Sequence, residues 1–351
     1  MRNYNCKNCG AILYWETDSN SLKCQFCDSE YAISDFDDET VDNSQVVNEE
    51  IDKEFANSDN IAEDMAVYEC KNCGGEVITL KTTMATICPY CSEAISITSK
   101  SVGDFRPDLC IPFKKDKKEI TKIYSDYVNK SFLTPKAFKE QSTIEKIQGL
   151  FTPFYLHDVQ DRASHLFEGE KVSSSKRGYD KVTTHKVYNL SIDANGKFEK
   201  IPTDASVKIE DKLMDAVEPF NYDEIKDYHP AYMAGFVAEQ MDEEKEAMTK
   251  RAVSRAKSGM NDKARSAFSG YSSVKTINEN HKISNHTSSY TMLPVWMLNV
   301  NHNNKKYTFA VNGQTGKVVG KLPMDKLKLV LIGLGTFLAS DVVLALISLF
   351  G

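Results

Sequence analysis

Two copies of one cysteine pattern constrain this chain more than any other feature. In each copy, two Cys-x2-Cys pairs are separated by 14 residues, and the second copy follows the first by 64 residues. A Cys-x2-Cys turn points two thiolates at one place, and a hairpin that returns a second turn completes a tetrahedral four-thiolate site. We therefore predict two Zn²⁺ sites. Their ligands are Cys6, Cys9, Cys24 and Cys27, and then Cys70, Cys73, Cys88 and Cys91.

Other uses of paired cysteines fit less well. Disulfides need an oxidising compartment, and residues 1–16 contain no apolar signal-peptide core. Redox pairs favour a βαβ context, which the surrounding pattern does not provide. Iron in a rubredoxin-like site would use the same ligands and stays an alternative to zinc. The ninth cysteine, Cys110, lies in an apolar run and is expected to be a core residue.

The predicted metals are structural. Four thiolates leave no open coordination position, whereas catalytic zinc keeps one. The two zinc ribbons, at residues 1–34 and 66–100, are also too small to fold on a core of their own, so metal binding is expected to fold them. We therefore expect rigid modules that present a surface to a partner.

Charge favours a protein partner over nucleic acid. The chain carries 43 Lys and Arg against 50 Asp and Glu, a net charge of −7. Neither ribbon is basic, whereas proteins that bind phosphate backbones concentrate Lys and Arg. Between the ribbons, residues 35–65 form an acidic segment that we predict to be a flexible linker. Within it, Val47, Ile51 and Phe55 at helical spacing leave a short docking helix open as an alternative.

The C-terminal end predicts a membrane anchor. Residues 329–351 contain a single charge, Asp341, and at 1.5 Å per residue a helix there spans about 34 Å, enough for a hydrocarbon core of about 30 Å. Lys321, Lys326 and Lys328 precede it, which predicts a cytoplasmic body. We expect a single-pass protein of the cell membrane. Asp341 is expected to pair with a polar group in another membrane protein or with a second copy.

Residues 104–322 are long enough for one sizeable domain, which we predict to be α+β with a central antiparallel sheet. Helices are expected at 116–130, 135–147 and 242–268, the last with apolar residues at every fourth position from Met248 to Phe268. Strands are expected at 151–167, 181–192, 197–201, 290–300, 305–311 and 317–319. The dipeptide Asn195-Gly196 predicts a hairpin turn, and residues 301–304 and 312–316 predict two more.

No catalytic motif emerges in this domain. Gly313-Gln314-Thr315-Gly316-Lys317 lacks the spacing of a phosphate loop and is interpreted as a β-turn. The seven histidines show no ligand spacing. His157, Asp158 and Asp161 lie close in sequence, but neighbours on a strand face opposite ways, so we interpret them as surface or satisfied core groups. We assign no catalytic residue and expect that the chain is not an enzyme.

Several motifs carry a resemblance to a known family. The chain resembles bacterial membrane-associated "TFIIB-type zinc-ribbon" proteins, which are linked to flotillin-like and phage-shock-type membrane-stress proteins. The resemblance implies partners of those two kinds and no catalytic residues. The motifs are Cys-Lys-Asn-Cys-Gly at 6–10 and 70–74, Ile111-Pro112-Phe113, Thr152-Pro153-Phe154-Tyr155, Pro202-Thr203-Asp204-Ala205-Ser206, Glu218-Pro219-Phe220, Tyr232-Met233-Ala234-Gly235-Phe236, Leu293-Pro294-Val295-Trp296 and the run 311–317.

Together these features predict a membrane-anchored cytosolic zinc-ribbon adaptor that recruits protein partners to the inner membrane. Two alternatives stay open. One is a nucleic-acid-binding factor tethered to the membrane, which a basic stripe on the folded protein would favour. The other is an enzyme with an unrecognised site in the middle domain.

Overall fold

The computed structural model describes residues 4–11, 13–36, 65–69, 76–80, 83–87, 94–96, 106–207 and 209–350. Its α+β class is as predicted. A sheet of ten strands has the order β11-β8-β13-β9-β12-β6-β7, with β10 beside β9 and with β14 and β15 continuing from β13. Pairing is mainly antiparallel, but β12 runs parallel to β9 and β13 parallel to β8. The bounds are β6 Thr83–Ile87, β7 Ala94–Ser96, β8 Leu109–Cys110, β9 Gln148–Arg177, β10 Asp180–Asp204, β11 Lys226–Asp227, β12 Val237–Glu239, β13 Ser273–His302, β14 Lys305–Asn312 and β15 Val318–Val319.

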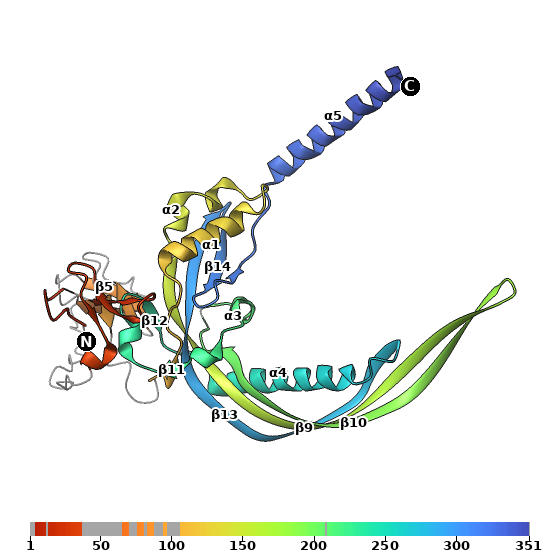
Figure 1. The fold of residues 1–351 in the computed structure, drawn as a ribbon, viewed down its shortest axis with the longest axis horizontal. Helices are drawn as coiled ribbons and strands as arrows, with labels where there is room; N and C mark the ends of the chain where they lie inside the picture. Colours follow the sequence, from red (N-terminus) through yellow and green to blue (C-terminus); the bar gives the residue numbers. More distant parts are fainter. Residues whose placement is uncertain are drawn as a thin grey trace.

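Strands β9, β10 and β13 leave the body together as a long curved arm (Figure 1). Helix α4 (Lys245–Ser266) lies along the concave face of this arm. The predicted four-residue repeat is confirmed, because one stripe of α4 is buried against the sheet. It consists of Met248, Ala252, Ala256, Met260 and Ala264. Small side chains in this stripe let the helix approach the sheet closely.

The predicted hairpin turn at Asn195-Gly196 is wrong. Strand β10 continues through it, with Asn195 opposite Arg162 and Gly196 opposite Asp161 of β9. Glycine there leaves room for α4: a Cβ on Gly196 would lie 2.6 Å from Met260 Cε. The helix packed on the sheet, rather than local turn chemistry, explains this residue.

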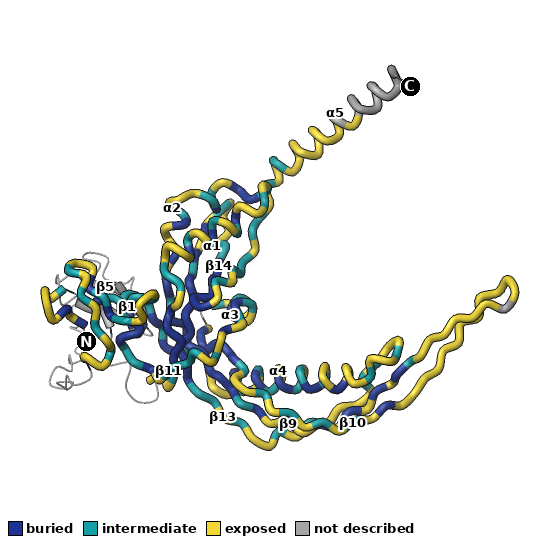
Figure 2. The backbone as a smooth tube through the Cα atoms, in the orientation of Figure 1, coloured by how far each residue is buried: buried dark blue, intermediate teal, exposed yellow. Residues whose placement is uncertain are grey.

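The real turn of this hairpin lies at Gly178 and Tyr179, where Gly178 has φ +65°. Strand β13 pairs with β9 only as far as Glu170, so the outer part of the hairpin has two strands. Residues 171–189, which we call the distal hairpin, are exposed wherever their side chains are described (Figure 2). The arm therefore has a covered inner part and an uncovered outer part.

One predicted helix of the body is confirmed and another is divided. Helix α1 (Lys117–Asn129) begins at a capping box in which Asp116 accepts from the Glu119 amide and the Glu119 side chain accepts from the Asp116 amide. The helix expected at 135–147 is instead η6 (Lys136–Phe138) and α2 (Gln141–Ile144). Fully buried Phe138 packs edge-on against aromatic rings of β14, and Glu140 is extended between the two short helices. Burial of Phe138 outweighs helix continuity.

The predicted turns of the last strands are confirmed. Asn303 and Asn304 have φ of 50° and 57° between β13 and β14. After β14, Asn312 Oδ1 accepts from the amides of Gln314 and Thr315, both at 2.9 Å, so residues 312–316 form a side-chain-stabilised turn. Cys110 is fully buried, as predicted. Shorter elements of this region are α3 Asp211–Val217, η7 Tyr222–Glu224 and η8 Pro230–Met233.

Helix α5 (Lys326–Phe350) projects from the body (Figure 1). Asp325 caps it, since its Oδ1 accepts from the amides of Leu327 and Lys328. Within the residues that the structure describes, no helix meets the combined length and apolarity needed to cross a bilayer. The acidic segment from 37 to 64, including its predicted short helix, lies outside the described residues.

Candidate metal centre

The first cysteine set lies in a small three-stranded sheet of β1 (Leu13–Glu16), β2 (Ser21–Cys24) and β3 (Glu30–Tyr31), followed by η1 (Ile33–Phe36). Its two turns have the same backbone pattern. Cys6 O accepts from the Gly10 amide at 2.8 Å, and Cys24 O accepts from the Asp28 amide at 3.0 Å. Gly10 and Asp28 both have positive φ, which reverses the chain after each pair. The Cys-x2-Cys spacing thus builds two equivalent knuckles.

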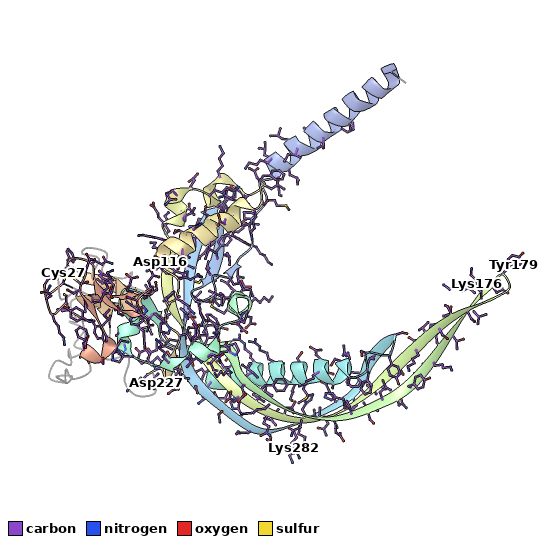
Figure 3. The ribbon with its side chains drawn as sticks, in the orientation of Figure 1. Cys27, Asp116, Lys176, Tyr179, Asp227 and Lys282 are labelled. Carbon is purple, nitrogen blue, oxygen red and sulfur yellow. The ribbon has the colours of Figure 1, made fainter. Side chains whose placement is uncertain are left out.

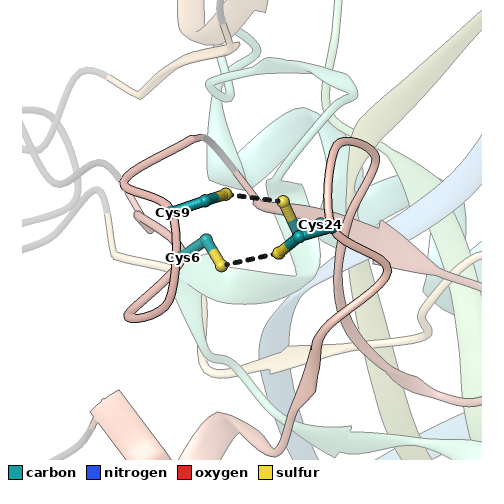
Figure 4. A group of neighbouring side chains, drawn as sticks. Cys6, Cys9 and Cys24 are labelled. Atoms are coloured by element: carbon teal, nitrogen blue, oxygen red, sulfur yellow. Dashed lines mark hydrogen bonds between the residues drawn. The ribbon is translucent and has the colours of Figure 1, made fainter.

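The knuckles bring four sulfur atoms together (Figure 4). Cys6 Sγ lies 3.4 Å from Cys27 Sγ, and Cys9 Sγ lies 3.5 Å from Cys24 Sγ. All four sulfurs lie within 4.8 Å of one another. Zn–S bonds of about 2.3 Å in a tetrahedron place sulfurs about 3.8 Å apart. These cysteines are free, because the distances far exceed a disulfide bond of about 2.05 Å. The set is therefore close enough to hold a metal.

Hydrogen bonds around the sulfurs tune their acidity. Burial opposes ionisation of Cys6, but the Tyr31 hydroxyl at 3.3 Å and backbone amides lower its pKa to about 6. The Ser29 hydroxyl, 3.1 Å from Cys27 Sγ, lowers the pKa of Cys27. The Ala11 amide lowers the pKa of Cys9, yet the adjacent thiols outweigh it and raise that pKa to about 12. Four thiolates this close repel one another, so full ionisation requires a cation among them.

The sheet that carries this site is part of the main core. The Trp15 amide donates to Ala234 O at 3.1 Å, and its ring meets Tyr232 edge-on at 4.8 Å. Lys226 Nζ donates to Asn20 Oδ1 at 3.0 Å. Strands β6 and β7, from the second predicted ribbon, also join the ten-stranded sheet. The first ribbon and strands β6 and β7 of the second are thus packed against the middle domain, whereas β4 and β5 form a separate two-stranded sheet.

The structure brings together one of the two predicted four-cysteine sets. Cys70, Cys73, Cys88 and Cys91 lie outside the described residues, although the flanking strands β4 (Met65–Glu69) and β5 (Glu76–Leu80) are described. A group of carboxylates at Asp204, Asp211 and Glu243 also converges. Arg251 already lies among them, with Nη2 2.8 Å from Asp204 Oδ1 and Nη1 within 3.4 Å of the other two. Its guanidinium supplies the cation.

Histidines that look scattered in the sequence gather on the arm. On β9, His157, Asp161 and His165 recur every fourth residue, so they share one face, and all three are buried. His157 Nδ1 lies 2.9 Å from His286 Nε2, and Asp161 Oδ2 lies 2.6 Å from His281 Nδ1. Burial and His286 lower the pKa of His157 to about 4. The four-residue spacing was the sequence signal for this cluster.

The predicted face alternation of His157 and Asp158 is confirmed. Buried His157 also bonds Thr203, with Nε2 2.9 Å from Oγ1, so it is a satisfied core group. Asp158 faces the other way and accepts from the Lys200 amide at 2.8 Å, where Lys200 has φ 55° and the β9–β10 register shifts.

Comparison with known proteins gives one relationship. No protein-family model matches the chain, and no solved structure matches it. The Bacillus subtilis (strain 168) protein named "Uncharacterized protein YdjG" is 34% identical over 349 residues, which cover 97% of this chain and 96% of that protein. Similarity of this level along nearly the full length of both proteins indicates common descent. The chain therefore belongs to the same family as Bacillus subtilis YdjG.

Proposed function

We propose that the chain is a membrane-anchored zinc-ribbon adaptor that recruits protein partners to the cytoplasmic face of the cell membrane. The observation that carries the proposal is the surface of α5. Nine consecutive residues, from Leu329 to Phe337, are exposed. Six large apolar side chains are exposed in this part of α5: Leu329, Val330, Leu331, Ile332, Leu334 and Phe337. A helical stretch with large apolar side chains exposed to solvent needs a covering surface, and we propose that lipid provides it.

The sequence around α5 supports a membrane orientation. From the sequence alone, an unbroken helix over residues 329–351 would be about 34 Å long, which would match a bilayer core of about 30 Å, and three lysines precede it. Positive flanks favour the cytoplasmic side. Thiolate metal ligands also favour a reducing compartment. Both arguments predict the same topology, with the body in the cytoplasm.

The four-cysteine centre supports a recruiting role rather than catalysis. If Zn²⁺ binds Cys6, Cys9, Cys24 and Cys27, its four positions are filled. Between the last two ligands, Phe26 is 83% exposed at the tip of its knuckle. An aromatic side chain held in water by a rigid turn is a suitable anchor for a protein interface. By the resemblance to membrane zinc-ribbon proteins, we propose flotillin-like or phage-shock-type proteins as partners.

Membrane attachment is tested by fractionation of cells that produce the full chain. We expect the full chain to stay in the membrane pellet after an alkaline carbonate wash, and a chain truncated after Asp325 to move to the supernatant. A full chain in the soluble fraction would contradict the anchor and indicate that a protein, or a second copy, covers α5.

Recruitment is tested on the full chain with Phe26→Ser. We expect partner proteins recovered after mild detergent extraction, and identified by mass spectrometry, to fall at least tenfold. Asn8→Ala changes an exposed residue of the other knuckle and serves as the control. Equal recovery by both variants and the unchanged protein would refute a role for this knuckle. Zinc content is measured in each to verify that the centre is intact.

One observation favours nucleic acid as a second candidate ligand. The distal hairpin carries five Lys or Arg residues and a single Asp. Tyr179 is fully exposed at its tip, near Lys176 and far from Cys27 (Figure 3). Basic residues beside an exposed aromatic ring suit a phosphate backbone and a stacked base. Fluorescence anisotropy with a labelled single strand tests this: binding that Tyr179→Ser and Lys176→Glu abolish supports it, and no binding at low salt refutes it.

A further inference from the structure

A second set of metal-ligating side chains lies on the arm, between β9, β13 and α4. His165 on β9 is directly opposite Glu279 on β13. His281 is opposite Ala163. Residues two apart on a strand point to the same face of the sheet, so His281 lies on the same face as Glu279 and His165. The pairing of two strands more than 100 residues apart therefore brings two imidazoles and one carboxylate to one place.

The geometry suits a single ion. One ligand atom from each of His165, Glu279 and His281 lies within 4.8 Å of the other two. The two imidazole rings are nearly perpendicular, at 83°, with centroids 5.4 Å apart. Bonds of about 2.0–2.2 Å to nitrogen and oxygen are reached by a small inward movement of the side chains. Zinc sites with two His and one Glu use this donor set.

Neighbouring residues hold two of these ligands in the orientation that metal binding requires. Asp161, which is fully buried, accepts from His281 Nδ1–H at 2.6 Å, and this leaves the lone pair of His281 on Nε2. A carboxylate in this position is the usual outer partner of a metal-bound histidine. From α4, Asn261 Nδ2 donates to Glu279 Oε2 at 2.7 Å.

The free nitrogens of the two histidines point to a ligand. His165 is 2% exposed, and neither of its ring nitrogens has a hydrogen-bond partner. His281 has a side chain that is 5% exposed, and its Nε2 has no partner either. Buried polar atoms in proteins nearly always have partners, so orphaned ones need an explanation.

We propose that His165, His281 and Glu279 bind a divalent transition-metal ion, with Zn²⁺ as the expected occupant and Asp161 as the residue that positions His281. The site is separate from the four-cysteine centre and does not depend on the proposed adaptor function. Three protein ligands leave the fourth tetrahedral position for an external ligand. The ion would also link β9 to β13 close to Asn261 of α4.

Metal content of the purified full chain tests this site. We expect the double variant His165→Asn/His281→Asn, produced with added Zn²⁺, to hold one zinc equivalent fewer than the unchanged chain. His185→Asn/His302→Asn removes two histidines outside the cluster and should leave the content unchanged. Equal zinc in all three proteins overturns the proposal. Circular dichroism verifies that each is folded.

Affinity measurements keep the test decisive if the double variant does not fold. Glu279→Gln alters an exposed residue, and Asp161→Asn keeps the shape of a buried one. In competition with a chromophoric chelator, Asp161→Asn should weaken Zn²⁺ binding about 10- to 100-fold, and Glu279→Gln, which alters a ligand, at least as much. The control Glu199→Gln should not. Unchanged affinity in both variants would show that these residues do not hold a metal.

Discussion

The four-cysteine centre and the polar cluster of the arm are built in opposite ways. Both are positioned by antiparallel strand pairs, yet Cys6 and Cys27 are 21 residues apart, whereas Asp161 and His281 are 120 apart. The centre depends on two turns that the local sequence dictates. The cluster depends on the register between β9 and β13 and on α4 covering one face. Local spacing in the sequence therefore reveals the first kind of site, while the second is found only once the pairing of the strands is known.

Loss of one ligand should disrupt the four-cysteine centre. Cys24→Ser removes a fully buried ligand, and structural zinc contributes about 10–16 kcal/mol to the folding of small zinc modules. We expect residues 4–36 to lose metal and their protection from hydrogen exchange. Cys110→Ala, at a buried cysteine far from the centre in sequence, should keep both. Undiminished protection in Cys24→Ser would mean that packing on the body, rather than metal, folds this sheet.

The ion pair between Arg251 and Asp204 is expected to stabilise the fold. Arg251 pairs with fully buried Asp204 and adjoins three further carboxylates. Arg251→Met leaves the Asp204 charge buried and uncompensated, which should lower the free energy of unfolding by about 3–5 kcal/mol. Urea denaturation measures the change. The neighbouring exposed Lys250→Met should cost under about 0.5 kcal/mol, and equal effects of the two would refute this assignment.

The buried His157 predicts a dependence on pH. Its pKa is lowered to about 4 in the folded protein from 6.5, so the unfolded chain binds more protons between these values. Stability due to this group is therefore complete above about pH 6.5 and is lost as pH falls toward 4, by at most about 3 kcal/mol. Urea denaturation at pH 7 and pH 5 should show a smaller difference for His157→Gln than for the exposed control His185→Gln. An identical difference would contradict a neutral buried imidazole.

The capping box of α1 is expected to make a smaller contribution to stability. Asp116→Ala removes the capping box of α1 and should cost about 1 kcal/mol. Asp126→Ala, at an exposed position within the same helix, is the control. Thermal unfolding of both variants distinguishes a cap from a general charge effect. A lower melting temperature for Asp126→Ala than for Asp116→Ala would be the contrary result.

Local chemistry explains which parts of this fold the sequence could predict. The α1 cap, the α4 repeat from Met248, the turn at Asn303-Asn304 and the first cysteine set depend on neighbours in the chain. The turn predicted at Asn195-Gly196 is wrong because both residues pair within β10, where Gly196 leaves room for Met260 of α4. The helix at 135–147 was mispredicted because Phe138 packs on rings from β14. The His165 and His281 pair stayed hidden because its spacing exists only across paired strands.

Zinc K-edge X-ray absorption on the purified His165→Asn/His281→Asn chain tests the structural metal centre most directly, because any remaining zinc should be held by cysteines. We expect the zinc to be surrounded by four sulfurs at about 2.3 Å, with no nitrogen or oxygen ligand. A shell of oxygen or nitrogen at about 2.0–2.2 Å, or a folded chain that retains no zinc, would contradict it.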